Sequence, residues 1–450
     1  MIHFPIAKGL RRQLALLTGP IFIETLLIIT LGAVDTVMLS RHSDASVAAV
    51  GVVNQIVMLC FLVFEVINLG TSVLVSQYLG AKLNDRVEKV VGVSLLVNLV
   101  IGFTISAMLY FGAIAILRLM GLNDMLLGEG VGYMRIVGAF AFFQALSLTA
   151  SAALRASNRA IYPMVVVGIV NILNIVGNYM LIFGKFGAPA LGVEGAAIST
   201  ATSRAIAMII LTIILFHTVV KRIPWEIFRR FPKRELSNLL KIGLPSAGEQ
   251  FSYSSAQIVM TFFINMLGLE VLAARTYVVN IVMFGYLFCI AISQGGAITI
   301  GHLVGKGKVS GAFILGKYVM RLAFIITVTL SVAIATAGHW ILSLLTDNPE
   351  IISIGATLLW LDVLVETGRP INIFATNALR ATGDVNYPFY VGLIVMWSLQ
   401  VAGGYLTGIY FGLGIYALWL MIASDEITRG IIFTRRWWSM KWAGKGFVTT

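Results

Sequence analysis

Carboxylates inside long apolar segments are the residues of this sequence best suited to chemistry. Asp35 lies in an apolar segment over residues 14–40, and Glu65 lies in another over residues 47–76. An ionised side chain at the centre of a bilayer costs at least about 2.5 kcal/mol, so a carboxylate kept there is a candidate functional group. Asp35 is the leading candidate for a group that takes up a proton from the outside and releases it inside; the alternative is a carboxylate that caps the helix or is hydrated near the outer end of its span. Glu65 is a further candidate for lining a cleft, although the sequence shows no partner for it.

Three asparagines form a polar stripe in the apolar segment over residues 162–184. Asn171, Asn174 and Asn178 stand at positions i, i+3 and i+7, so they share one face of a helix. One explanation is hydrogen bonding between helices, which is common in membrane bundles. The other is a polar shell around a bound ion.

A second charged group lies in the segment over residues 350–377. Asp362, Glu366 and Arg369 stand at i, i+4 and i+7 and therefore share a helix face. Arg369 neutralises one acid, so the group keeps a negative charge unless one carboxyl is protonated. An ion pair that holds the helix in place is one interpretation, and a site that attracts organic cations or binds a coupling ion is the other.

Two glutamates occupy equivalent places in the two halves of the chain. Glu24 and Glu249 each follow a proline, Pro20 or Pro245, by four residues. This shared placement favours a structural role near the cytoplasmic ends of their helices, as partners of arginines. The alternative for Glu249 is a cation site in the second half, and for Glu24 a place on a cleft wall.

Composition indicates that membrane helices position these residues. Hydrophobic residues make up 58% of the 450 positions and charged residues only 12%, against roughly a quarter charged in soluble domains. Many apolar segments are long enough to cross a hydrocarbon core of about 30 Å. The sequence predicts an all-α polytopic protein with twelve spans: 14–40, 47–76, 90–117, 128–152, 162–184, 192–220, 243–267, 272–300, 312–345, 350–377, 387–411 and 413–434.

The chain repeats itself at an offset of 225 residues. The segment Ala153-Leu154-Arg155-Ala156-Ser157 pairs with Ala378-Leu379-Arg380-Ala381-Thr382, and Tyr162-Pro163 pairs with Tyr387-Pro388. Six spans per copy give both copies the same topology, so the repeats are parallel and related by an axis along the membrane normal. We therefore predict an amino-terminal six-helix lobe over residues 1–220, a linker over 221–241 and a carboxy-terminal lobe over 242–450.

Basic residues indicate the orientation of the chain. Most of the 32 Lys and Arg residues lie in segments on one side of the predicted spans, whereas Arg41, Arg118, Lys185 and Arg275 lie on the other. This asymmetry predicts that both termini are cytoplasmic, and it explains the net charge of +12 without nucleic acid. The first apolar segment is too long for a cleaved signal peptide, so we expect it to be retained. The linker is predicted to lie on the cytoplasmic leaflet, and its amphipathic stretch contains Trp225, Phe228, Phe231, Arg229, Arg230, Lys233 and Arg234.

Several kinds of chemistry have no support in the sequence. The five histidines have no metal-ligand spacing, and the phosphate-binding pattern G-x-x-x-x-G-K-[ST] does not occur. We therefore expect no metal site, no cofactor and an ion gradient as the energy source. A membrane-embedded enzyme is the competing class, in which the intramembrane acids would be catalytic, but no nucleophile and base pair stands out.

Short motifs in a fixed order resemble those of one transporter family. They are the repeated Ala-Leu-Arg-Ala-Ser/Thr element followed by Tyr-Pro, Val34-Asp35-Thr36, the run over residues 75–81, and Gly195-Ala196-Ala197-Ile198. Together they resemble the multidrug and toxin extrusion family over essentially the whole chain. The segment 366–369, Glu-Thr-Gly-Arg, is similar to the Glu-Pro-Gly-Arg signature of one bacterial branch, with Thr in place of Pro.

The resemblance implies two lobes in a V shape and alternating access. It also implies export of amphipathic, often cationic, compounds coupled to inward flow of H⁺ or Na⁺. Asp35 is then central to coupling, with Asn174, Asn178 and Thr200 as its polar shell; some relatives have aspartate where this chain has Asn178. We expect a monomer in the cytoplasmic membrane that handles small organic substrates.

The alternative function is a flippase for lipid-linked oligosaccharides, or a metabolite exporter, for example of a flavin, with the same superfold. Flippases of that kind place many basic residues in the cleft. Among the basic residues of the predicted spans are Arg135, Arg204 and Arg369, and acids and asparagines are at least as prominent, which favours cationic or zwitterionic cargo.

Overall fold

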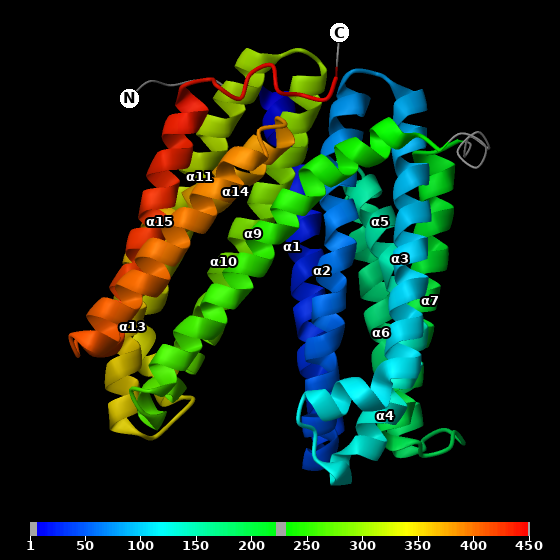
Figure 1. The fold of residues 1–450 in the computed structure, drawn as a ribbon, viewed down its shortest axis with the longest axis vertical. Coiled ribbons are helices and arrows are strands. Elements are labelled where there is room, and N and C mark those ends of the chain that lie inside the picture. Colours follow the sequence, from blue (N-terminus) through cyan, green and yellow to red (C-terminus); the bar gives the residue numbers. More distant parts are fainter. Residues whose placement is uncertain (1–6, 222–230, 449–450) are drawn as a thin grey trace. The chain divides into compact units, whose positions relative to one another are not determined.

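The computed structural model of the protein describes residues 7–221 and 231–448. These residues form long helices joined by short turns, with no β-strand among them (Figure 1). Nine of the described helices are long and apolar enough to cross a membrane, and the pair α4–α5, bent by 46°, adds a tenth. The described residues thus form an all-α, multi-pass membrane protein, as the composition predicts.

The helices divide between two compact units, residues 19–243 and residues 1–18 with 244–450. Helix α1 begins in the unit of residues 1–18 and 244–450 and continues into the unit of residues 19–243. Helix α9 begins in the unit of residues 19–243 and continues into the other unit. We call residues 19–243 the Asp35 unit and the remainder the Asp362 unit. The predicted linker segment 222–230, with Trp225, Phe228, Arg229 and Arg230, lies outside the described residues. The predicted lobe boundaries stay a prediction.

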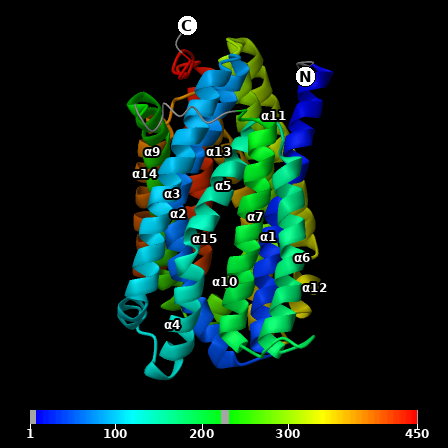
Figure 2. The same ribbon diagram turned by 90° about the vertical axis from the view of Figure 1, so that its right-hand side faces the viewer.

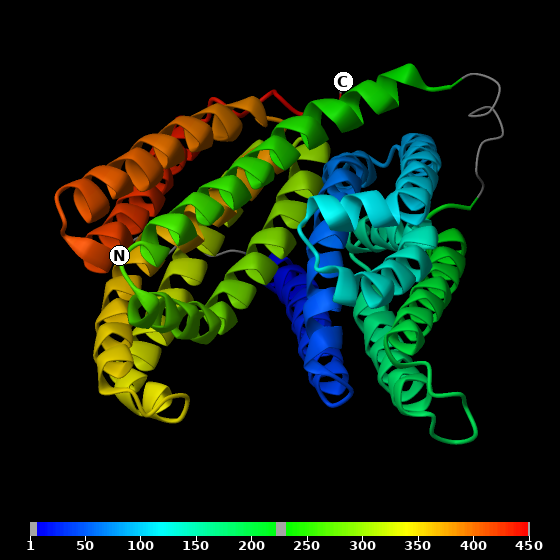
Figure 3. The same ribbon diagram turned by 60° about the horizontal axis from the view of Figure 1, so that its bottom comes forward.

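The Asp35 unit contains most of α1 and the helices from α2 to α7. Their bounds are α1 (Lys8–Ser40), α2 (Asp44–Gly80), α3 (Asn84–Leu119), α4 (Asp124–Ala139), α5 (Ala141–Ala156), α6 (Ile161–Phe183) and α7 (Gly192–Thr218). Helix α7 packs against both α5 and α6 (Figure 2). The longest described loop of this unit, residues 184–191, joins α6 to α7 (Figure 3).

The Asp362 unit contains most of α9 and the rest of the described chain. Its helices are α9 (Lys233–Asn265), α10 (Leu269–Gly305), α11 (Val309–Thr336), α12 (Gly338–Ser343), α13 (Pro349–Ala381), α14 (Asn386–Val395), the π-helical segments η1 (Met396–Gly403) and η2 (Tyr405–Tyr410), and α15 (Gly414–Trp438). Helix α13 packs against α10, α11 and α15. It therefore lies at the centre of this unit.

Three of the predicted spans are interrupted in the structure. The span over 128–152 breaks at Phe140, and the backbone N–H of Phe142 that the break frees donates to the Ser106 hydroxyl at 3.3 Å. In the span over 312–345, helix α11 ends at Thr336 and α12 begins at Gly338. A Cβ at Gly338 would lie 2.7 Å from Leu359 of α13. The span over 387–411 is α-helical only to Val395 and then π-helical.

Helices α9 and α15 are long, but they are not among the described helices that are apolar enough throughout to be counted as spans. Helix α9 starts at Lys233, ten residues before the predicted span, so residues 233–242 belong to the same helix as the span. Helix α15 contains Asp425, Glu426 and Arg429, all buried. The polarity of these two helices therefore belongs partly to the interior of the protein.

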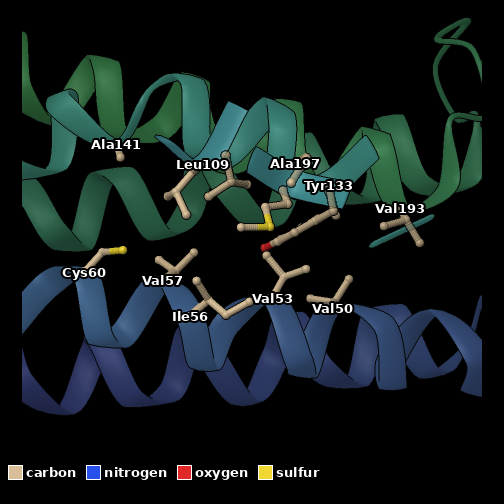
Figure 4. Close-up of a cluster of buried hydrophobic side chains, with 14 of the residues drawn as sticks. Val50, Val53, Ile56, Val57, Cys60, Leu109, Tyr133, Ala141, Val193 and Ala197 are labelled. Atoms are coloured by element: carbon tan, nitrogen blue, oxygen red, sulfur yellow. The ribbon is translucent and has the colours of Figure 1, made fainter. Parts of the chain in front are cut away.

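Apolar clusters hold each unit together. In the Asp35 unit, side chains of α2, α3, α4, α5 and α7 form a core in which Tyr133 is the one hydroxyl-bearing side chain among the labelled residues (Figure 4). Glycines allow the closest helix contacts: a Cβ on Gly195 would lie 2.5 Å from the Leu181 carbonyl oxygen. Close backbone approach at small residues is typical of membrane bundles, which lack a hydrophobic driving force between helices.

Candidate functional site

A chain of hydrogen bonds joins Asp35 to helices α6 and α7. The amide nitrogen of Asn178 donates to Asp35 Oδ1 at 2.7 Å and to Asn174 Oδ1 at 3.1 Å. The amide nitrogen of Asn174 donates in turn to the Thr200 hydroxyl at 3.4 Å. The structure therefore brings together Asp35, Asn174, Asn178 and Thr200, the four residues predicted for the ion-coupling site; their role stays a prediction.

The geometry follows from the spacing of the asparagines on α6. Asn174 and Asn178 lie one helical turn apart, and each is only 1% exposed, so their amides stack along the interior face of the helix. Because the nitrogen of Asn178 faces two acceptors, the hydrogen-bond network fixes the orientation of that amide. Asp35 itself is half-buried on α1. The carboxylate therefore lies at the end of a buried polar chain.

The third asparagine of the stripe has a different partner. The amide nitrogen of Asn171 donates to the backbone carbonyl of Leu27 at 2.7 Å, which ties α6 to α1 two turns away from Asp35. Only two asparagines of the predicted stripe therefore join the Asp35 chain. Asn171 is an interhelical hydrogen-bonding residue, as the structural interpretation of the stripe predicted.

Two residues near Asp35 were not among the predicted site residues. Arg204, on α7 one turn after Thr200, interacts electrostatically with Asp35 and with Tyr133. Tyr133 is 6% exposed and reaches from α4 into the apolar core (Figure 4), where it lies next to Thr200. An arginine inside a predicted span was the signal for Arg204, whereas nothing in the sequence distinguished Tyr133 from the other aromatic residues.

The repeat-related glutamates form repeat-related ion pairs. Glu24 accepts from Arg155 at 2.7 Å, and Glu249 accepts from Arg380 at 2.6 Å. The two pairs are related by the same 225-residue offset. Each ties the proline-containing helix of its unit to the helix that ends in the Ala-Leu-Arg-Ala element, as expected for structural partners. Glu249 also interacts at longer range with Arg429, so its proposed part in a cation site stays a prediction.

Glu65 has neighbours that the sequence did not reveal. It lies next to Asn68 and within electrostatic range of Arg155, the partner of Glu24. Asn68 in turn accepts from Asn98 at 3.0 Å and from the Thr149 hydroxyl at 3.1 Å. Glu65 therefore belongs to a polar network on α2, α3 and α5 that also connects to the Glu24 ion pair.

The acids of α13 are part of a larger charged cluster. Arg369 donates to Glu366 at 2.5 Å and lies 3.7 Å from Asp362. Among the described residues, one oxygen of Glu366 is buried without a hydrogen-bond partner, and the Asp362 carboxyl, also buried, lies next to Trp419 of α15. The predicted grouping of Asp362, Glu366 and Arg369 thus has a carboxyl oxygen left over for a further ligand or a proton.

Helix α15 contributes a second charged trio that sequence reasoning missed. Arg429 forms ion pairs with Asp425 and, at 3.4 Å, with Glu426, and Glu426 accepts from the Asn372 amide of α13 at 2.6 Å. Asp425 and Arg429 stand at i, i+4, so the two side chains pair on one face of the helix and neutralise each other's charge. Together with the α13 group, these residues form one cluster of four buried carboxyls and two guanidinium groups. Within residues 7–221 and 231–448, no set of three His, Cys, Asp or Glu residues is arranged to hold a metal ion.

Comparison with known proteins identifies the family. A family model described as MatE matches residues 20–180 and 245–406, two segments that begin 225 residues apart. The uncharacterized transporter YisQ of Bacillus subtilis (strain 168) is 40% identical over 432 residues, which cover 96% of this chain and 95% of that protein. The probable multidrug resistance protein NorM of Thermotoga maritima is 25% identical over 443 residues, covering 98% of this chain and 95% of that protein.

Solved structures agree with the fold. A crystal structure of MATE in the bent conformation has a TM-score of 0.88 at 21% identity, covering 97% of this chain and 99% of that one. A MOP superfamily transporter from Pyrococcus furiosus Vc1 (DSM3638) has a TM-score of 0.87 at 21% identity, covering 99% and 100%. Similarity at this level of identity concerns the fold alone, whereas the family model covers most of the chain. The chain therefore belongs to the MatE family, the multidrug and toxin extrusion proteins that its motifs resemble, and it is a membrane transporter rather than an enzyme.

Proposed function

We propose that this transporter exports small amphipathic organic compounds, chiefly cations, in exchange for H⁺ or Na⁺ that enters through the Asp35 site. The observation that carries the proposal is the bond from Asn178 to Asp35 at the end of a buried polar chain. A carboxylate in an apolar bundle is costly to keep, and a group that binds a cation in each transport cycle accounts for that cost. Relatives named multidrug resistance proteins support an efflux role.

The proposed coupling step changes the packing of α1. While Asp35 is ionised, its oxygen accepts from Asn178 and holds α1 against α6. A cation on the carboxylate neutralises the charge and weakens this charge-assisted bond, since hydrogen bonds to an ionised acceptor are about twice as strong as neutral ones. Helix α1 is then free to repack, which changes the affinity for cargo. We place both termini in the cytoplasm, the protein in the cytoplasmic membrane, and the working unit as a monomer.

The Asp362 unit is the proposed site of attraction for cationic cargo or of a second coupling ion. In the cluster of α13 and α15, four buried carboxyls exceed two guanidinium groups, and among the described residues Glu366 keeps one oxygen without a hydrogen bond. An excess of buried acid suits a cationic ligand and opposes a polyanionic one. The competing function, a flippase for pyrophosphate-linked lipids, requires the reverse excess. Arg369 and Arg429 are already paired with acids, so they support the cationic assignment.

The test is transport into liposomes that contain the purified protein. A proton gradient and a sodium gradient are imposed in separate experiments, and one of the two should drive movement of ethidium by the wild type and not by Asp35→Asn. The matched control is Asp44→Asn, the same chemical change at an exposed carboxylate in the first turn of α2; it should transport like the wild type. Undiminished gradient-driven transport by Asp35→Asn would overturn the coupling role. Absence of cation transport by the wild type under either gradient would favour the flippase or metabolite exporter.

A further inference from the structure

The two repeats place an arginine at equivalent positions in unlike surroundings. Arg204 on α7 and Arg429 on α15 are separated by the repeat offset of 225 residues. Arg429 has two acidic partners on its own helix, Asp425 and Glu426. The equivalent positions before Arg204 are Thr200 and Ala201. The acids that neutralise the arginine in one unit are therefore missing from the same helix in the other.

Arg204 is nevertheless half-buried. Its Nη1 atom is buried and has no hydrogen-bond partner among the described residues, and its guanidinium carbon lies 5.3 Å from the centre of the Phe61 ring. A cation over an aromatic face is attracted to the ring, but this contact does not neutralise it. A buried guanidinium needs an anion nearby, because an unpaired buried charge is strongly unfavourable.

The anion available to Arg204 is Asp35. Hydrogen bonds lead from Asp35 through Asn178 and Asn174 to Thr200. Thr200 lies one helical turn before Arg204, on the same face of α7. The charges of Asp35 and Arg204 interact without forming a direct ion pair. Besides Arg204, the titratable group that faces this position is the Tyr133 hydroxyl of α4.

We propose that Arg204 is the resident counter-ion of Asp35 and makes this site select a proton over a metal cation such as Na⁺. This inference rests on the proposed coupling role of Asp35 and names the ion that the site accepts. The guanidinium occupies the electrostatic role that a bound Na⁺ would otherwise fill. Arg204 is thus a specificity-determining residue of the ion site.

The groups around the carboxylate explain the selectivity. Asn178 donates an N–H to Asp35, and Arg204 adds its positive charge to the site. Asn178 Oδ1 is an oxygen next to the carboxylate that is buried and has no hydrogen-bond partner among the described residues, so oxygen ligands alone do not exclude a metal cation. Like charges at close range in the interior repel strongly, so it is the charge of Arg204 that opposes Na⁺ at this carboxylate. A proton forms a covalent O–H bond on one carboxyl oxygen and requires no coordination shell.

The experiment measures sodium binding without any cargo, using the purified full-length protein in detergent at neutral pH. The melting temperature is recorded in NaCl and in choline chloride at equal ionic strength. We expect no sodium-specific shift for the wild type and for Arg204→Lys, which keeps the charge. Arg204→Gln should gain a saturable rise in melting temperature with Na⁺, because a ligand that binds the folded state stabilises it. The double variant Arg204→Gln/Asp35→Asn should lose that gain.

Two comparisons make the result decisive. Arg135→Gln is the matched control, the same change at an exposed arginine over Tyr110, and it should gain no response to sodium. A sodium-specific shift in the wild type that disappears in Asp35→Asn would overturn the proposal, and so would a folded Arg204→Gln that ignores Na⁺. Should Arg204→Gln not fold, Arg204→Met takes its place and the same two outcomes decide. Failure of the coupling role is seen separately, as undiminished gradient-driven transport by Asp35→Asn in liposomes.

Discussion

Replacing Glu24 by Gln should destabilise the protein through its ion pair with Arg155. The Glu24 side chain is 6% exposed and that of Arg155 is 21% exposed, and their charged atoms lie 2.7 Å apart. Breaking a buried ion pair by removing one partner costs about 3–5 kcal/mol. Because Arg155 reaches some solvent and glutamine keeps one acceptor oxygen, we expect a loss of about 2–3 kcal/mol. For a unit of this size that corresponds to a fall in melting temperature of roughly 4–12 °C.

The assay is a double-mutant cycle on the detergent-solubilised protein, with the fraction that remains monodisperse after heating as the readout. Glu24→Gln, Arg155→Gln and the double variant are compared with the wild type. Residues in direct contact give coupling energies of about 0.5–3 kcal/mol, so the double variant should lose less than the sum of the single losses. Glu350→Gln, at an exposed glutamate in the first turn of α13, is the control.

Strict additivity of the two single losses would refute the ion-pair reasoning. The repeat-related pair offers an internal replicate: Glu249 and Arg380 lie 2.6 Å apart with side chains 14% and 13% exposed. Glu249→Gln should therefore lower the melting temperature by an amount similar to Glu24→Gln. A loss of transport in Glu249→Gln without a loss of stability would instead favour the cation-site interpretation of Glu249.

Three more outcomes test separate contacts. Gly368→Ala should cost about 1–3 kcal/mol by overpacking, since a Cβ there would lie 2.4 Å from the backbone of α15. The control Gly9→Ala, at a position with open space around it, should leave the melting temperature unchanged. Equal melting temperatures of the two variants would contradict the close approach of the helices at Gly368. Asn178→Leu should abolish gradient-driven transport, while Asn171→Leu should mainly lower stability; the reverse result would move the ion site along α6. Asp384→Asn should speed tryptic cleavage of the C-terminal segment, because this buried carboxylate holds two cationic residues near the end of the chain; unchanged cleavage would show that the segment is held by other contacts.

Much of the fold was predictable because its signals are periodic. The 225-residue offset and the long apolar segments predicted the helices, and the i, i+3, i+7 stripe predicted that Asn174 and Asn178 face the interior together. The break at Phe140 and the π-helical segments were not predictable, since they depend on which side chain, such as Ser106, accepts a freed backbone N–H. Tertiary partners of that kind leave no local pattern in the sequence.

The charged trio of α15, Asp425, Glu426 and Arg429, was not among the predicted site residues. An arginine near the end of a predicted span, such as Arg429, is counted among the cytoplasmic basic residues by the positive-inside rule. Arg429 is in fact 4% exposed and paired with Asp425 and Glu426. Hydropathy treats each of these residues as charged, whereas their pairing within one helix neutralises the charges. The residue pattern Asp-Glu-x-x-Arg was therefore visible, but only tertiary structure shows that it faces Asn372 rather than solvent.

The two repeats have kept their structural ion pairs and changed the charges of the candidate sites. The Glu24–Arg155 and Glu249–Arg380 pairs are equivalent in type, distance and position. By contrast, Asp35 corresponds to Met260, and Thr200 corresponds to Asp425. Each unit therefore keeps an arginine on the equivalent helix but supplies its counter-charge from a different place. In the Asp362 unit, the acids Asp425 and Glu426 lie on the same helix as Arg429 and pair with it directly. In the Asp35 unit, this part is proposed for Asp35, on a different helix, and a cation bound to the carboxylate would then change the balance of charge around Arg204.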